Sequence, residues 1–118
     1  RLLRALCPRC RARRAPGWRD PRLAGHPPDG EPVWEPRGTV SPPVGPAVGV
    51  ECAACGGSGY RGRIAVPEVL VADAAVTERV AAGASAARLV EAARAAGMRT
   101  LWENAVERVR AGATSVDE

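Results

Sequence analysis

The four cysteines, arranged as two CxxC pairs, constrain this chain more than any other feature of its sequence. One pair is Cys7 and Cys10, the other is Cys52 and Cys55, and together they account for all 4 cysteines. A CxxC turn directs two thiolates to one point, and two such turns supply the four sulfur ligands of a closed tetrahedral zinc site. A closed site leaves no position for water or substrate, so the sequence predicts one structural zinc ion bound by these four residues.

Two other roles for the cysteines stay open, namely disulfide bonds and redox-active dithiols. The segment before Cys7 is too short and too charged for an export signal, and paired CxxC motifs without export favour a metal over disulfides. One metal ion also uses both pairs more simply than two redox centres would. His26 is an alternative ligand, but we expect a loop histidine because four cysteines already complete the shell.

A proline-rich stretch separates the two pairs. All but one of the 11 prolines lie between residues 8 and 46. Proline lacks an amide donor and disfavours a helical conformation of the preceding residue, so we expect the proline-rich residues 8–46 to form a loop. A loop of this length requires its ends to be held together, which a zinc ion at its base would do.

Four arginines lie in or just after the first cysteine pair, namely Arg9, Arg11, Arg13 and Arg14. They either offset the negative charge of the zinc centre or lie solvated in the loop.

The second half of the chain has regular patterns. Residues 60–71 are rich in β-branched and apolar residues, which predicts a short strand that Pro67 limits to an edge or a bulge. Residues 1–6 are too short to assign as strand or helix. Three helices are expected at 73–83, 85–97 and 100–112, each beginning with a capping residue and ending at glycine. We therefore expect an α+β fold, with a loop-rich four-cysteine zinc subdomain and a short strand, followed by a small bundle of about three helices.

The expected domain division places the zinc subdomain at residues 1–60 and the strand with the helical subdomain at residues 61–118. Thr100 and Glu103 have the spacing of a capping box at the start of the last helix. The same spacing at Ser115 and Glu118 predicts the start of a further helix. Together with the missing initial methionine, it leads us to expect a piece of a longer protein.

The last helix carries an apolar stripe that includes Trp102. We expect Trp102 to pack against Val80, Leu89 and Val90 and to hold the three helices together. The alternative is that Trp102 is exposed here because it faces another part of the parent protein or a neighbouring subunit.

Composition and missing motifs limit the function. All 17 basic residues are arginine, and the net charge is +4. Ala, Arg, Gly and Pro are all abundant in this chain and all have GC-rich codons. The excess of arginine therefore reflects genome composition and does not by itself indicate nucleic-acid binding. No apolar run is long enough for a transmembrane segment. The chain has no phosphate loop, no HExxH motif and a single histidine. We therefore expect no catalytic residue, no nucleotide-binding residue and no enzymatic activity of this chain alone.

Three stretches, taken in order, resemble one family. They are RLLRALCPRC at residues 1–10, CAACGGSGYRGRIAVPEVL at 52–70 and GMRTLWENAVERVRAGATSVDE at 97–118. They resemble the C-terminal end of the traffic ATPases of type II secretion and type IV pilus assembly, the general secretory pathway protein E family. Residues 11–50 are unmatched, and Ala65, Pro67 and Asn104 depart from the family pattern.

The resemblance implies a parent protein that is a cytoplasmic hexameric ATPase. It would power secretion or pilus assembly from the periphery of the inner membrane, through platform proteins of that membrane, without a transmembrane segment or a nucleic-acid partner. ATP and Mg²⁺ would bind to the parent outside this chain. Only the four zinc ligands Cys7, Cys10, Cys52 and Cys55 carry over as functional residues.

Two other classes compete with this resemblance. The first is a stand-alone zinc module that binds nucleic acid through the basic half, with steep salt dependence, or binds a protein partner. The second is the cysteine-rich module of J-domain co-chaperones, because residues 52–59 fit its CxxCxGxG repeat. That module needs four such repeats, and the first pair lacks the glycines.

Overall fold

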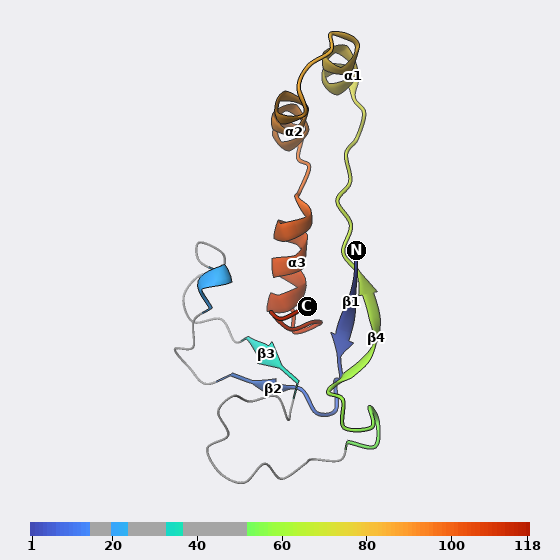
Figure 1. Ribbon diagram of the computed structural model, residues 1–118, viewed down its shortest axis with the longest axis vertical. Helices are drawn as coiled ribbons and strands as arrows, with labels where there is room; N and C mark the ends of the chain where they lie inside the picture. Colours follow the sequence, from blue (N-terminus) through green and yellow to red (C-terminus); the bar gives the residue numbers. More distant parts are fainter. Residues whose placement is uncertain (15–19, 24–32, 37–51) are drawn as a thin grey trace. The chain divides into compact units, whose positions relative to one another are not determined.

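The computed structural model describes residues 1–14, 20–23, 33–36 and 52–118 (Figure 1). His26 and most of the predicted loop lie outside these ranges. Within them the chain forms three α-helices, four short strands and one turn of 3₁₀ helix at Pro21–Leu23. The predicted α+β class is therefore confirmed. None of the described helices has the length and the hydropathy to cross a membrane.

The two longest strands pair with each other. β1 (Leu2–Leu6) runs antiparallel to β4 (Tyr60–Ala65), with Leu3 opposite Ile64 and Leu6 opposite Tyr60. Leu2 is exposed and the next residue, Leu3, is buried, because successive side chains of a strand point to opposite faces. Leu6 is also buried, since a register shift between Arg4 and Leu6 interrupts this alternation. The predicted strand at 60–71 is thus shorter than expected. It ends before Pro67, which cannot donate a hydrogen bond to a ladder.

A second ladder lies between the two cysteine pairs in sequence. β2 (Ala12–Arg13) runs antiparallel to β3 (Trp34–Glu35). This short pairing falls inside the stretch that we expected to be loop. The guanidinium of Arg13 lies over the Trp34 ring, 5.0 Å from its centroid, so a cation–π contact accompanies the pairing.

The chain divides into two compact units. The first comprises residues 1–66 and 105–118. Its buried apolar cluster consists of Leu23, Val106 and Val109, with the half-buried Val33 and Val116 packed against it. This unit therefore combines both cysteine pairs with the end of the chain. The expected division into subdomains at residues 1–60 and 61–118 stays a prediction.

The second unit, residues 67–104, contains α1 (Ala74–Ala81), α2 (Ala86–Ala95) and the first turn of α3 (Leu101–Arg110). The Asp73 carboxylate accepts from the Val76 amide and caps α1 as predicted. Ser85 stands at the start of α2, but its side chain makes no capping bond. At α3 the predicted capping box is confirmed: the Thr100 amide donates to the Glu103 carboxylate at 2.8 Å, and the Glu103 amide donates to the Thr100 hydroxyl at 3.2 Å.

Two of the residues that depart from the family pattern meet in this second unit. The Asn104 side-chain amide donates to the Pro67 carbonyl at 2.8 Å, and a carboxylate at position 104 could not donate this bond. The neighbouring Glu68 carboxylate accepts from the Leu101 amide at 2.6 Å, where the first turn of α3 leaves a donor without a helical partner. These two bonds tie the start of α3 to the segment that follows β4.

The expected burial of Trp102 is wrong. Its side chain is 46% exposed, and Val80 and Val90, two of its expected partners, are 58% and 43% exposed. The buried side chains of α1 and α2 are the smaller Val76, Ala92 and Ala93. Helices that bury mainly alanine approach closely and leave little room for an indole between them.

Candidate metal centre

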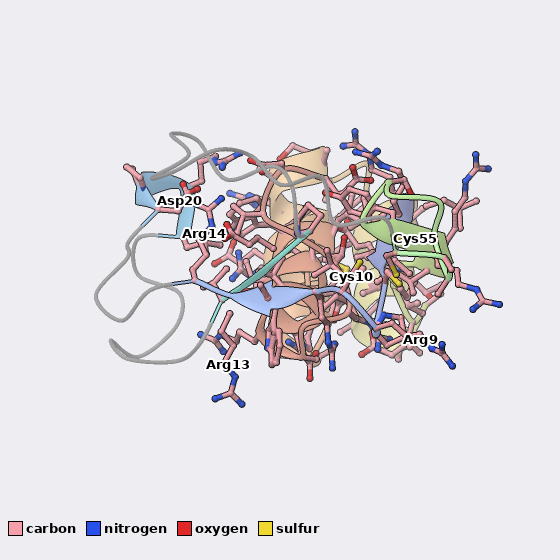
Figure 2. The ribbon with its side chains drawn as sticks, turned by 90° about the horizontal axis from the view of Figure 1, so that it is seen from below. Arg9, Cys10, Arg13, Arg14, Asp20 and Cys55 are labelled. Atoms are coloured by element: carbon pink, nitrogen blue, oxygen red, sulfur yellow. The ribbon has the colours of Figure 1, made fainter. Side chains whose placement is uncertain are left out.

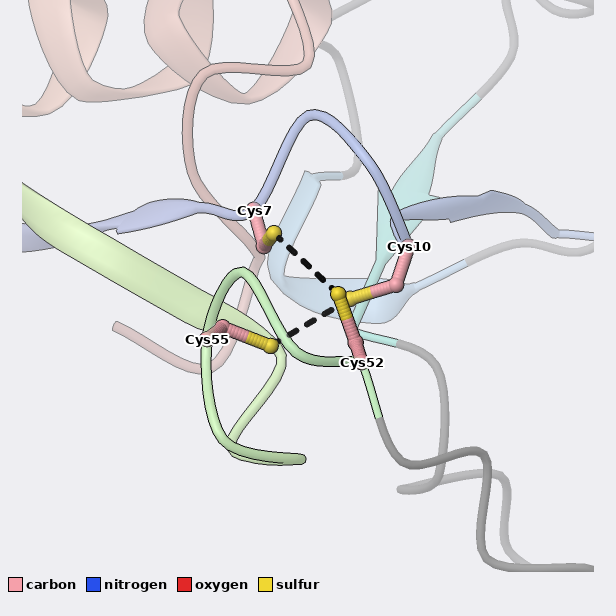
Figure 3. Close-up of side chains that lie close together, drawn as sticks. All are labelled: Cys7, Cys10, Cys52 and Cys55. Atoms are coloured by element: carbon pink, nitrogen blue, oxygen red, sulfur yellow. Dashed lines mark hydrogen bonds between the residues drawn. The ribbon is translucent and has the colours of Figure 1, made fainter.

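The two CxxC pairs form turns of the same kind. In the first, the amide of Cys10 donates to the Cys7 carbonyl at 3.2 Å. In the second, the amide of Cys55 donates to the Cys52 carbonyl at 3.0 Å. Each turn reverses the chain, so both of its sulfurs lie on one side (Figure 3). We call these two turns the first and the second knuckle.

The pairing of β1 with β4 brings the knuckles together. The first knuckle begins where β1 ends, and the second lies just before β4 begins. The Cys7 amide donates to the Gly59 carbonyl at 2.9 Å, which continues the contact between the strands up to the cysteine. Pairs that are distant in sequence therefore meet at one point.

The four sulfurs have the spacing that a tetrahedral metal requires. All four Sγ atoms lie within 4.8 Å of one another. The Cys7 and Cys52 sulfurs are 3.9 Å apart, and those of Cys10 and Cys55 are 3.6 Å apart (Figure 3). A zinc–sulfur bond of about 2.3 Å places two ligands of a regular tetrahedron about 3.8 Å apart. The sulfur positions and the all-thiol donor set therefore fit a zinc ion.

Burial and charge also distinguish the four thiols. Cys7 and Cys10 are buried, whereas Cys52 and Cys55 are half-buried. Burial raises the pKa of Cys10 to about 12, and hydrogen bonds to the neighbouring thiols add to the rise. Burial also opposes ionisation of Cys55, but the Gly59 amide and the Cys10 thiol outweigh it and lower the pKa of Cys55 to about 7. A bound cation would favour the thiolate form of the whole set.

Most of the arginines beside the first knuckle interact with other residues. Arg14 pairs with the buried Glu35, with 2.5 Å between Nε and Oε2. Arg11 lies over the Trp34 ring at 4.5 Å from its centroid. Figure 2 shows Arg13 and Arg14 well apart from the cysteine sulfurs. The expectation that the arginines beside the first knuckle offset the charge of a zinc centre stays a prediction, and Arg13 and Arg14 do not lie at the sulfurs (Figure 2).

Residues near the end of the chain also contact the knuckle region, and no sequence pattern predicts this contact. The Leu6 amide donates to the Ala113 carbonyl at 2.9 Å. The hydroxyls of Tyr60 and Ser115 form a hydrogen bond of 2.8 Å. We expect Ser115 to start a further helix, but residues 115–118 are not helical in the structure. The sequence signals at this position, the capping pattern and the family resemblance, did not point to a contact with the cysteine region.

Comparison with known proteins places the chain in a family. The profile of the family described as "Type II/IV secretion system protein" matches residues 1–118. The Type II secretion system protein HxcR of Pseudomonas aeruginosa is 33% identical over 118 residues, which is all of this chain and 19% of HxcR. The Type II secretion system protein E of Klebsiella pneumoniae is also 33% identical over 118 residues, which is 21% of that protein.

A third relative matches a shorter stretch more closely. The Type IV pilus assembly ATPase PilB of Thermus thermophilus is 41% identical over 70 residues, which is 59% of this chain and 8% of PilB. The chain thus spans about a fifth, or less, of the length of these relatives. The match of the family profile nevertheless extends over the whole chain, which therefore belongs to the type II/IV secretion system protein family.

Proposed function

We propose that this chain forms the C-terminal part of an ATPase that powers type II secretion or type IV pilus assembly, and that it contributes a structural zinc site. Two kinds of observation support the proposal. The relatives named above are secretion-system proteins and a pilus assembly ATPase. The observation that carries the zinc site is the set of four sulfurs at tetrahedral spacing.

In this proposal Cys7, Cys10, Cys52 and Cys55 hold the ion, and the ion has no part in a reaction. A zinc ion with four thiolate ligands is a closed structural site. Structural zinc contributes about 10–16 kcal/mol of apparent folding free energy in zinc-finger peptides. The buried apolar cluster of the first unit is small, so we expect the metal to supply much of the order of that unit.

The remaining parts of the proposal concern the parent protein. ATP and Mg²⁺ would bind outside these residues, since the chain contains no phosphate loop. The parent would act as a hexamer at the cytoplasmic face of the inner membrane, where platform proteins of the secretion or pilus system would recruit it. We accordingly expect no ATP hydrolysis by this chain alone.

The zinc site is tested by metal content. The chain is purified under reducing conditions without added metal, and zinc is measured by mass spectrometry beside a titration of free thiols. We expect one zinc ion per chain, and loss of it in Cys52→Ser. Ser58→Ala is the matched control, because its hydroxyl bonds the Cys55 carbonyl in the same knuckle without being a ligand. Negligible metal together with four free thiols in the unmodified chain would refute the site.

The Cys52→Ser variant also tests how far the influence of the metal extends. We expect residues 1–66 to lose order, whereas α1 and α2 keep their helical signal, because they contain no ligand. A salt-dependent shift of the unmodified chain with DNA or RNA would instead favour a nucleic-acid module.

A further inference from the structure

The last eight residues of the chain, 111–118, pack against the knuckles as a strap. Two polar residues in this strap are almost completely buried: Thr114 is 0% exposed and Ser115 is 3% exposed. Buried hydroxyls need hydrogen-bond partners, and the partners of these two identify what the strap holds.

The first set of strap bonds goes to the chain on both sides of the first knuckle. The Thr114 hydroxyl donates to the Arg4 carbonyl at 2.8 Å, and the Leu6 amide donates to the Ala113 carbonyl at 2.9 Å. Arg4 and Leu6 belong to β1, which ends at Cys7. On the other side of the knuckle, Arg11 donates from Nη1 to the Gly112 carbonyl at 2.5 Å. The strap therefore contacts the residues directly before and directly after this knuckle.

A second contact reaches the start of β4, which follows the second knuckle. The hydroxyls of Ser115 and Tyr60 are 2.8 Å apart. Tyr60 follows Gly59, whose carbonyl accepts from the Cys7 amide and whose amide bonds the Cys55 sulfur. Through Tyr60 the strap is thus joined to Gly59, which forms hydrogen bonds with one cysteine of each knuckle.

We infer that the strap fixes the distance between the knuckles, and that Thr114 and Ser115 are positioning residues for the metal centre. This inference rests on the proposed zinc site. If docking of the strap raises the affinity of the four sulfurs for metal, then bound metal must raise the equilibrium constant for strap docking by the same factor. This follows because thermodynamic linkage between two equilibria is reciprocal. Metal loading is thereby coupled to the carboxyl end of α3, which leads directly into the strap.

The experiment measures metal affinity with Co²⁺ and Zn²⁺ as probes. Thiolate-to-cobalt absorption reports the ligand set, and chelator competition gives the affinity. Removing a buried hydrogen bond while leaving its acceptor unsatisfied should weaken binding about tenfold in Thr114→Val. Thr114→Ser keeps the hydroxyl and should restore the affinity. Thr77→Val is the control, because its hydroxyl bonds the carbonyl of the N-cap residue Asp73 within the second compact unit, which contains no cysteine.

The reciprocal readout is amide hydrogen exchange at Leu6, the donor to the strap. We expect zinc to slow this exchange in the unmodified chain, and to slow it less in Thr114→Val. If Thr114→Val fails to fold, Ser115→Ala, Tyr60→Phe and the double variant decide the question, since the pair should show coupled effects on metal affinity.

The outcomes separate the two proposals. If the unmodified chain binds neither metal, the zinc site is refuted and the strap inference with it. If the unmodified chain binds zinc while the Thr114, Ser115 and Tyr60 variants bind it equally tightly, only the strap inference is refuted. Weaker binding with unchanged absorption, restored in Thr114→Ser, supports it.

Discussion

Replacing Gly112 by alanine should destabilise the first compact unit more than an ordinary glycine substitution. Gly112 follows α3 with a φ of 66°, a conformation that L side chains rarely adopt. A Cβ at this position would lie 2.5 Å from Cδ1 and 2.8 Å from Nε1 of Trp34. Both the backbone conformation and the packing therefore oppose a side chain.

The expected size is the sum of two contributions. The left-handed backbone costs alanine about 1–2 kcal/mol. Overpacking against a fixed neighbour costs about 1–3 kcal/mol more. The Trp34 ring cannot move away freely, because the guanidinium of Arg11 lies 4.5 Å from its centroid and also bonds the Gly112 carbonyl. We expect the free energy of unfolding to fall by about 2–5 kcal/mol.

Urea unfolding followed by circular dichroism measures this loss, and Gly62→Ala is the matched control. Gly62 belongs to the same unit and has a φ of 78°, but nothing lies within 4 Å of an added Cβ. Its substitution should cost only the backbone contribution. In a Trp34→Ala background, Gly112→Ala should then cost no more than Gly62→Ala. Equal losses for the two single variants would refute the packing argument.

Two further predictions concern hydrogen bonds that end on side chains. Thr100→Ala should lower the free energy of unfolding by about 1 kcal/mol in a denaturant titration, whereas Ser85→Ala, whose hydroxyl makes no capping bond, should cost clearly less. The bonds from Arg4 lower the pKa of Glu118 below its ordinary value of 4.5, so their stabilisation is present above that pH and is lost as the pH falls through the folded-state pKa. Glu118→Gln should therefore lower the melting temperature at pH 7, and this difference should shrink as the pH falls below 4.5 and vanish below the folded-state pKa.

The elements that could be predicted from sequence are those with local causes. The cysteine cluster could be found because ligand type and CxxC spacing act within one turn. The helices could be found because their caps and terminal glycines lie within a few residues of the periodic segments. The end of β4 before Pro67 likewise has a local cause, because a proline has no backbone N–H to donate to a strand ladder.

The strap and the Trp34 packing could not be predicted in this way. The bond from Thr114 to Arg4 joins residues 110 positions apart, and the bond from Arg11 to Gly112 joins residues 101 positions apart. Such contacts involve single side chains and single carbonyls, so they leave no periodic pattern in the sequence. The sequence pattern correctly predicts that Gly112 ends a helix, but the second role of this glycine, making room for the Trp34 indole, depends on the tertiary fold.

Trp102 shows where periodicity stops being informative. The pattern of α3 correctly placed apolar residues on one stripe, yet periodicity defines a face and does not identify the surface that covers it. Val106 and Val109 from this stripe are buried in the first unit with Leu23, whereas Trp102 belongs to the second unit and stays 46% exposed. One helix thus contributes to two compact units. Its stripe is divided between them where the chain crosses from residue 104 to 105, and no signal in the helix itself marks that division.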